Sequence, residues 1–217
     1  MKFAVSRPQT LCAKTTSVQT THTFLYLYPI MLTINFNPFP ELKSDRLHLR
    51  KVTAADAAGI FALRSSPEVM KYIPRTLLTS EQHAVEFIAA RMDTMLAANE
   101  GIDWAITLNG SGELIGTMGI YRIKPQHHRG EIGYMILPQH QGKGIVTEGI
   151  DMVLDYAFNR LQLHSMEAVI DPANIPSERV LQKNGFVKEA HFLENECYNG
   201  VYYDSVIYSL LKRNYKK

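Results

Sequence analysis

The chain has 217 residues, of which 46% are hydrophobic and 20% are charged, and its formal net charge is +2. Domains usually run to about 100–200 residues, so this length favours one domain with an extension. Residues 1–30 carry three basic side chains and no acidic one, which leaves residues 31–217 with a net charge of −1. The domain is therefore not basic, and nucleic acid is not expected as a partner.

The cysteine content and the lengths of the apolar runs indicate the cellular compartment that we expect. The two cysteines, Cys12 and Cys197, make a poor disulfide framework and favour a reducing compartment, the cytoplasm. The longest apolar run, Phe24–Ile34, has 11 residues and contains a proline. A membrane span needs about 18 apolar residues, so no membrane association is expected.

We assign residues 1–40 to a loosely ordered extension and residues 41–217 to the domain. The first 30 residues are rich in threonine and show no sustained period. A secretory signal would have its apolar core nearer Met1 and a small-residue cleavage site after it, and neither is clear. An organellar transit peptide and a natural start at Met31 both stay open.

Periodicity and turn residues predict the elements in chain order. Alternation predicts a strand at 47–52, and Thr53 with Asp56 then predicts the cap of a helix. Prolines interrupt the chain at 65–74, and Ser80 (or Thr79) begins a second helix that reaches Leu96. Further along, the patterns predict strands at 104–108, 114–123 and 130–137, a helix at 147–160, a strand at 166–170, a helix that ends at Asn184-Gly185, and two strands around Asn199-Gly200. This order predicts an α+β fold with a mixed, mainly antiparallel sheet flanked by helices.

The stretch between the 130–137 strand and the next helix predicts an anion site. Backbone N–H groups of a glycine turn point outward at a helix N-terminus, where the helix dipole also favours negative charge. The glycine spacing fits neither a P-loop nor a dinucleotide-binding fingerprint. The residues that we expect to cradle a pyrophosphate are Gln141, Gly142, Lys143, Gly144, Ile145, Val146 and Thr147.

Two motifs at this spacing resemble the GNAT family of acetyl-CoA-dependent N-acetyltransferases. The first is Q/R-x-x-G-x-G/A, filled by Gln141, Gly144 and Val146, of which Val146 departs from the usual Gly or Ala. The second is N-x-x-S-x-x-x-L-x-x-x-G-F, filled by Asn174, Ser177, Leu181, Gly185 and Phe186. The resemblance covers about residues 42–212 and is nearest to the enzymes that acetylate ribosomal-protein N-termini. It implies the GNAT fold with splayed central strands, acetyl-CoA as co-substrate, no metal, and a primary amine as acceptor.

The resemblance also implies roles for residues around the cradle. Ile136 and Leu137, at the end of the strand before it, would offer backbone groups to the pantetheine arm. Asn174 would contact the cofactor, although Asn is equally suited to a plain helix cap. Many GNAT enzymes protonate the leaving sulfur with a tyrosine at the position of Leu181. Leucine cannot do this, so the departure favours Ser177, which matches a serine of the family and is the leading candidate for the acid, or a water.

A general base is needed only to the extent that the acceptor amine is protonated. An α-amino group has a pKa of about 7.7–8.0 and a lysine side chain one of about 10.4, so a protein N-terminus needs little help. Glu196 matches a glutamate given this role in the ribosomal-protein branch, and Glu131 is the second candidate. Either glutamate is as easily a solvated surface charge. Tyr72 and Arg75, between the first two helices, are candidate acceptor contacts or plain loop residues.

Three other features have simpler interpretations. His127-His128 lacks a third ligand at a sensible spacing and makes a poor metal site. Tyr198, Tyr202 and Tyr203 are expected to pack across strands. Asp204 matches a family acid, for which a structural hydrogen bond and a substrate contact are both open.

The leading function is acetylation of a protein N-terminal amine. The alternatives are acetylation of a small amine, such as a polyamine, an aminoglycoside or an amino acid, and a non-catalytic acyl-CoA-binding module. An acidic pocket would favour a polyamine, and the charges of residues 65–79 and 191–198 are too mixed to decide between the acceptors. The resemblance also allows a homodimer.

Overall fold

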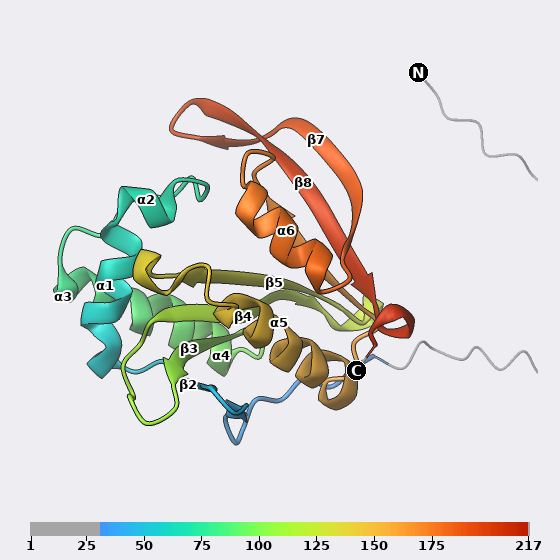
Figure 1. Cartoon of the computed structure of the whole chain (residues 1–217), viewed down its shortest axis with the longest axis horizontal. Helices are drawn as coiled ribbons and strands as arrows, with labels where there is room; N and C mark the ends of the chain where they lie inside the picture. The colour runs from blue at the N-terminus through green and yellow to red at the C-terminus, as the bar shows by residue number, and fades with distance from the viewer. Residues whose placement is uncertain (1–30, 217) are drawn as a thin grey trace, which may run out of the picture. The chain divides into compact units, whose positions relative to one another are not determined.

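The computed structural model describes residues 31–216, so the expectation for residues 1–30 lies outside the described residues. One sheet and the helices on its faces make up this part of the chain (Figure 1). The strands are β1 (Leu42–Lys43), β2 (Leu47–Lys51), β3 (Ile102–Leu108), β4 (Gly116–Lys124), β5 (Arg129–Ile136), β6 (Ser165–Ile170), β7 (Val187–Tyr198) and β8 (Val201–Leu211). The main helices are α1 (Ala57–Ser65), α2 (Pro67–Met70), α3 (Glu81–Phe87), α4 (Thr94–Ala97), α5 (Ile145–Asp155) and α6 (Ile175–Lys183).

The strands form one sheet in the order β1-β2-β3-β4-β5-β6-β8-β7. Every recorded pairing within residues 31–216 is antiparallel except that of β5 with β6, which is parallel. The predicted α+β class and mixed, mainly antiparallel sheet are thus confirmed. No helix in the described part of the chain is long and apolar enough to cross a membrane.

Several element boundaries differ from the sequence prediction for local reasons. Strand β1 has two residues, too few for a periodic pattern to reveal it. Helix α2 begins at Pro67, which we read as a breaker; proline is favoured at the first helical position, where its missing N–H costs nothing. Helix α5 begins at Ile145 rather than Thr147, and a π-helical turn, Tyr156–Arg160, completes the predicted segment.

Two apolar clusters occupy the opposite faces of the sheet. Side chains alternate between faces along β5, so Ile132 and Ile136 join the large cluster with α5 and α6, whereas Met135 joins the smaller cluster with α1 and α3. By the same alternation, Tyr134 faces α5 and α6 and Glu131 faces the side of α1 and α3. The alternation of side chains along β5 therefore determines on which side of the sheet each candidate residue lies.

Residues 31–40, which we assigned to the extension, contribute to the large cluster. Phe36 is 3% exposed, and Leu32, Ile34 and Phe39 pack against the same core. The Trp104 indole Nε1 donates a hydrogen bond of 2.6 Å to the Pro40 carbonyl. The segment before β1 is therefore packed onto the domain.

This packing gives a stability prediction. Phe36→Ala should lower the free energy of unfolding by about 3–5 kcal/mol, because it removes a buried ring and leaves a cavity. The measurement is urea unfolding followed by circular dichroism. Met31→Ala is the control, since Met31 is 65% exposed and its truncation should change stability by less than about 0.5 kcal/mol. Equal effects of the two substitutions would contradict the packing of Phe36.

Candidate active site

The site is built around the point where β5 and β6 separate. Their parallel ladder joins Arg129 to Ser165 and ends at the pair Glu131 and Glu167. Beyond it, β5 continues to pair with β4 and β6 with β8, so the two strands diverge. The Leu137 N–H bonds Ile115 on the β4 side, and strand alternation therefore points the backbone of Ile136 into the gap. Leu137 has its N–H bound to Ile115 and its carbonyl bound by His140, so its backbone is already engaged.

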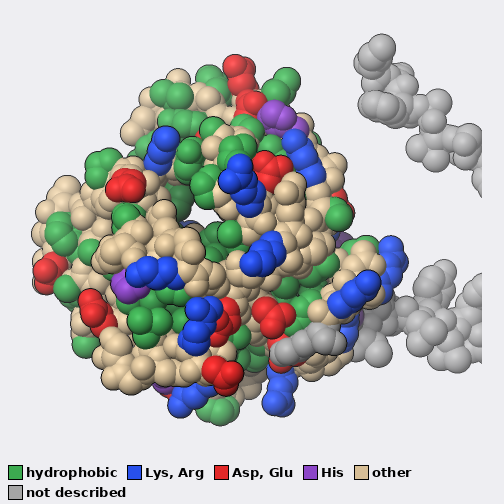
Figure 2. All heavy atoms as spheres, in the orientation of Figure 1, with side chains coloured by type: hydrophobic (Ala, Val, Ile, Leu, Met, Phe, Trp, Pro, Cys, Tyr) green, Lys and Arg blue, Asp and Glu red, His purple; other side chains and the backbone are tan. Residues whose placement is uncertain are grey.

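A cavity of about 910 Å³ opens at this separation. Its lining residues come from both faces of the sheet and include Glu131, Tyr134, Asn174 and Ser177. The face seen in Figure 2 is hollowed near its middle. Three residues predicted from the sequence, Glu131, Asn174 and Ser177, thus line one cavity together with Tyr134.

The predicted cradle lies where β5 leads into α5. Gly142 and Gly144 have φ values of +71° and +75°, a region that strongly favours glycine, and Gly144 is the N-cap of α5. The first intrahelical bond recorded there runs from the Glu148 N–H to the Gly144 carbonyl, so Ile145, Val146 and Thr147 supply the first-turn amides. Gln141 to Gly144 are exposed, while Ile145 is buried and Val146 packs against the core. This geometry suits an anion.

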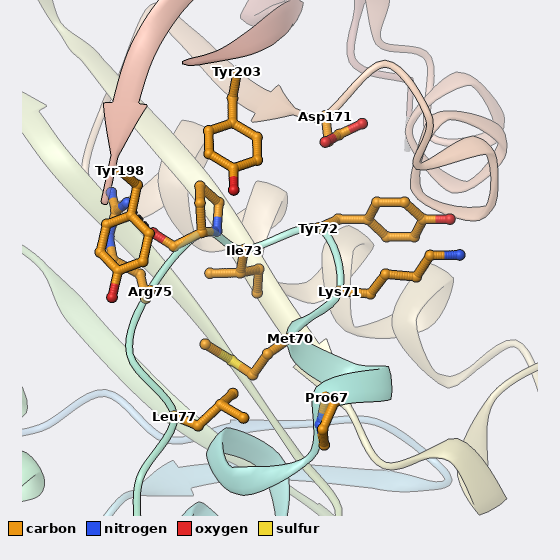
Figure 3. Close-up of a pocket in the computed structure, with 11 residues that line it drawn as sticks. Pro67, Met70, Lys71, Tyr72, Ile73, Arg75, Leu77, Asp171, Tyr198 and Tyr203 are labelled. Carbon is orange, nitrogen blue, oxygen red and sulfur yellow. Dashed lines mark hydrogen bonds between the residues drawn. The ribbon is translucent and has the colours of Figure 1, made fainter. Parts of the chain in front are cut away.

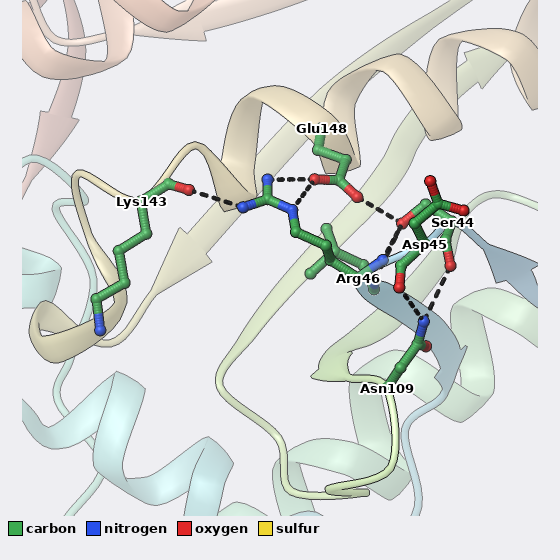
Figure 4. A network of polar contacts seen from close by, with 7 residues as sticks. Ser44, Asp45, Arg46, Asn109, Lys143 and Glu148 are labelled. Carbon is green, nitrogen blue, oxygen red and sulfur yellow. Dashed lines mark hydrogen bonds and ion pairs between the residues drawn. The ribbon is translucent and has the colours of Figure 1, made fainter.

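An ion-pair network holds the outer side of the cradle (Figure 4). The Arg46 guanidinium, from the turn before β2, pairs with Glu148 and donates a hydrogen bond of 3.3 Å to the Lys143 carbonyl. The Ser44 hydroxyl donates to the second Glu148 oxygen at 2.6 Å. The side-chain amide of Asn109 binds the carbonyls of Ser44 and Asp45. Arg46 was not among the predicted residues, since no motif connects it to a loop about 100 positions later.

Ser177 lies against the cavity from the α6 side. Its backbone N–H donates to Asn174 Oδ1 at 3.2 Å, so Asn174 is the N-cap of α6. Its hydroxyl is 2.7 Å from the Tyr134 hydroxyl, and the side chain is 8% exposed. Burial raises the pKa of Tyr134 to about 12, so this phenol stays protonated at neutral pH.

Sequence reasoning missed Tyr134. The available signal was its parity: a tyrosine on the core-facing side of β5 requires a partner for its hydroxyl. Leu181, at the position where many family members have tyrosine, is fully buried in the large cluster. A phenol from the strand therefore stands beside Ser177, although the helix offers none.

Arg122 pairs with one candidate base, Glu131, and is influenced by the charge of the other, Glu196. Glu131 pairs with the Arg122 guanidinium at 2.5 Å, and burial raises the pKa of Glu131. The charge of Glu196 acts on both Arg122 and Glu131, which places it nearby, but it is not among the residues that line the large cavity. Arg122 has a φ of +47° at the bulge in β4, and bulges often direct side chains next to active sites.

A smaller cavity of about 270 Å³ adjoins the loop after α2 (Figure 3). Tyr72 and Arg75 line both cavities, and Tyr198 and Tyr203 line the smaller one. The Tyr198 hydroxyl is 2.5 Å from Thr76 Oγ1, which links the loop to the β7–β8 hairpin. Tyr198 and Tyr203 thus line a cavity as well as belonging to paired strands.

Tyr202 and Asp204 do not line either of these two cavities. Tyr202 is 62% exposed. Asp204 accepts hydrogen bonds from the His191 ring and the Glu194 N–H, both inside the hairpin, and these partners lower its pKa. Among residues 31–216, no group of three or more His, Cys, Asp or Glu side chains is placed to hold a metal ion.

A partly buried polar pair, Asp103 and Tyr121, forms part of the cavity wall on the α1 and α3 side. The Tyr121 hydroxyl donates to Asp103, and the Tyr121 ring crosses Gly119 and Gly133, where a Cβ atom would come within 2.6 and 2.9 Å of it. Burial raises the pKa of Asp103 to about 6, although the Tyr121 hydrogen bond and the charges of Arg64 and Arg91 oppose the rise. The carboxyl is therefore harder to ionise in the folded protein than in the unfolded chain.

This shift predicts a pH dependence of stability. The folded protein holds a proton on Asp103 between about pH 4 and pH 6 that the unfolded chain has lost, so this group favours folding more as the pH falls through 6. Asp103→Asn removes that dependence. The stability of the variant relative to wild type should rise by about 2 kcal/mol between pH 4.5 and pH 7.5, as measured by urea unfolding. A pH-independent difference would show that Asp103 titrates normally.

Comparison with known proteins agrees with this geometry. The sequence profile of the family described as "Acetyltransferase (GNAT) domain" matches residues 46–187. The uncharacterized N-acetyltransferase YoaA of Bacillus subtilis is 38% identical over 174 residues, which cover 80% of this chain and 98% of YoaA.

Solved structures show the same fold. A GNAT-family acetyltransferase from Bacillus anthracis is 28% identical with a TM-score of 0.72, and the match covers 80% of this chain and 99% of that one. Spermidine N-acetyltransferase from Vibrio cholerae, crystallised with CoA and spermine, is 26% identical with a TM-score of 0.69 over 79% of this chain and 99% of that one. The glycine cradle, the separating strands and the family profile therefore lead to one conclusion: the chain belongs to the GNAT family of acetyl-CoA-dependent N-acetyltransferases.

Proposed function

We propose that the protein transfers the acetyl group of acetyl-CoA to a protein N-terminal amine through the gap between β5 and β6. The observation that carries the proposal is the placement of the polar groups on either side of this gap. Ser177 and Tyr134 lie on the α5 and α6 side, whereas Glu131 faces the α1 and α3 side. An amine and a thiol leaving group can then occupy opposite faces of the sheet.

The residues present suit acetyl-CoA, which supplies an activated acyl group as a thioester. The first-turn amides of α5 and the turn at Gly142–Gly144 would receive its pyrophosphate. The backbone of Ile136, which points into the gap, would pair with the amides of its pantetheine arm. Asn174 is engaged as the α6 cap, so its contribution there would be to position Ser177.

The chemistry needs one proton acceptor and one proton donor. The amine nitrogen forms a bond to the acetyl carbon, the carbon–sulfur bond breaks, and the amine gives its proton to a carboxylate. We assign this acceptor role to Glu131, because it lines the cavity and its raised pKa favours proton uptake. Glu196, the first candidate from sequence, would act through its charge on Arg122 and Glu131. The sulfur receives a proton from the Ser177 hydroxyl, and the hydrogen-bonded Tyr134 O–H passes its own proton to the serine oxygen. Solvent then returns a proton to Tyr134, while Glu131 releases the proton that it took from the amine.

The charge of the cavity supports a peptide acceptor over a polyamine. The large cavity is lined by four arginines and four acids: Arg64, Arg75, Arg91, Arg122, Glu100, Asp103, Glu131 and Asp171. Recognition of a polycation calls for a surplus of negative charge, which this wall lacks. A protein N-terminus also presents an amine of lower pKa than a lysine side chain or an alkyl amine. Acetylation of small amines remains the second candidate, supported by the spermidine acetyltransferase among the structural relatives.

Thiol release from acetyl-CoA tests the acceptor and the assigned acid and base together. Peptides that begin with Ala or Ser should turn over faster than spermidine, an aminoglycoside or free amino acids.

Glu131→Gln should reduce kcat about 10²-fold at pH 7, and its kcat should recover above pH 8, where the acceptor amine loses its own proton. Ser177→Ala should show a similar loss without recovery at high pH.

The comparison variant for the base is Glu196→Gln. A larger loss in Glu196→Gln than in Glu131→Gln, with the same recovery at high pH, would transfer the role to Glu196. Acetyl-CoA binding by calorimetry separates the alternatives: binding without turnover on any amine would favour a non-catalytic acyl-CoA-binding module. Turnover on small amines alone would keep the chemistry and replace the acceptor.

The network behind the cradle predicts an effect on acetyl-CoA affinity. Glu148 places a negative charge in the first turn of α5, and Arg46 neutralises it. Arg46→Gln should therefore raise the acetyl-CoA KM about tenfold through loss of electrostatic and positional support, with the acceptor KM unchanged. The double substitution Arg46→Gln with Glu148→Gln should recover part of this loss, because the uncompensated charge is gone.

The matched control for Arg46 is Arg213→Gln, an exposed arginine of the Lys212–Asn214 turn. It should leave both KM values within about twofold of wild type. Equal effects of Arg46→Gln and Arg213→Gln on acetyl-CoA would contradict a role of Arg46 in the cradle.

A further inference from the structure

Arg64 is a partly buried cation that lines the large cavity. It lies in the last turn of α1, and its guanidinium carbon is 4.1 Å from the centre of the Phe87 ring of α3. None of the ion pairs or side-chain hydrogen bonds recorded among residues 31–216 includes its guanidinium. Burial lowers the pKa of Arg64. The guanidinium is partly exposed and has five N–H donors, for which a ligand in the cavity can supply acceptors.

A second arginine stands beside it. Arg91 belongs to the π-helical turn Ile88–Asp93, four residues after Phe87, and lines the same cavity. Its positive charge adds to the fall in the pKa of Arg64, so the two cations lie near enough to repel each other. Arg91 is exposed and Arg64 is partly buried, so the cavity wall between them carries positive charge that an anion would neutralise.

The nearby acids do not satisfy these cations directly. Asp103 accepts the hydrogen bond of Tyr121 and acts on Arg64 only from a distance. Glu100 lines the cavity too, but no ion pair between it and Arg64 or Arg91 is recorded among the described residues. Glu131, on the same side of the sheet, is paired with Arg122. The wall near α1 and α3 therefore offers unpaired positive charge, while the wall near the gap offers a carboxylate.

We propose that the acceptor carries a carboxylate as well as its primary amine, and that Arg64 and Arg91 bind this carboxylate while the amine reaches Glu131. The inference rests on the proposed acetyl transfer and names the chemical class of its acceptor. A guanidinium matches a carboxylate through two parallel hydrogen bonds, which a neutral amide cannot reproduce. The carboxylate has two sources: an acidic side chain close behind a protein N-terminus, or the α-carboxylate of a free amino acid.

Arg64 also has structural contacts that the test must separate from binding. A cation in the last turn of α1 is favourable to the helix dipole, and its stacking on Phe87 stabilises the α1–α3 contact. Loss of these contacts would lower stability and affect all acceptors alike. Loss of an anion site would affect only acceptors that carry the carboxylate.

The experiment compares matched acceptors by thiol release from acetyl-CoA. One pair is a peptide that begins Ala-Asp against the same peptide with Ala-Asn, and the other is alanine against alaninamide. In wild type, kcat/KM should favour the carboxylate member of at least one pair by about tenfold or more, the value of a charge-assisted hydrogen bond. The pair that shows the preference identifies the source of the carboxylate.

Substitutions then locate the preference. In Arg64→Gln the ratio within that pair should fall to about one, because the carboxylate member loses about tenfold more kcat/KM than its uncharged partner. Arg64→Lys should retain part of the preference, because it keeps the charge and loses the two-point geometry. Arg91→Gln should also reduce the ratio. If circular dichroism shows that Arg64→Gln is unfolded, the ratio in Arg91→Gln decides the test. Arg213→Gln should leave the ratio unchanged.

The contrary outcomes are distinct. If the wild-type protein turns over the uncharged acceptor as fast as its charged partner in both pairs, the carboxylate inference is wrong. The proposed acetyl transfer would be unaffected by that result. If Arg64→Gln and Arg91→Gln lower kcat/KM equally for both members of a pair, the arginines have a structural role. That result would also overturn the carboxylate inference. Absence of turnover with every amine tested would overturn the proposed function itself.

Discussion

The arrangement of this protein depends on the early end of one hydrogen-bond ladder. If β5 and β6 stayed paired along their full length, the sheet would be closed and the two faces would be separate. Because the ladder ends at Glu131 and Glu167, the strands diverge and expose backbone groups that need partners. A co-substrate with amides of its own suits that need. The same divergence joins the space beside α6 to the space beside α1 and α3, so two reactants can meet inside the sheet.

Strand alternation then distributes the chemistry between the two sides. Glu131 and Tyr134 are three positions apart on β5, so their side chains lie on opposite faces, where Arg122 and Ser177 are their respective partners. Rigid strands hold both groups, so neither depends on a mobile loop for its position. The loops contribute at the periphery, through the glycine turn on one side and the segment around Tyr72 on the other.

Much of the fold could be predicted from the sequence, because it depends on local patterns. Alternation, the Asn199-Gly200 turn and the caps at Ser80 and Asn174 are properties of a few adjacent residues, and the structure has them where expected. Helix α2 and the packing of Phe36 were missed, since one depends on a proline in its favourable position and the other on a distant core. The glycine turn was found for the same local reason. Arg46 and Arg64 were not, because only tertiary structure brings them to the cradle and the cavity.

The position of Trp104 has a practical consequence. It is the only tryptophan in the chain, fully buried, and its indole contacts Phe39 before β1 and Tyr156 at the end of α5 by edge-on ring packing. Its N–H is bound to Pro40. The chain's one indole fluorophore, which can be excited apart from the tyrosines, therefore lies where the leading segment, the sheet and the far end of the cradle helix meet. Its emission can report motion of any of the three without a label.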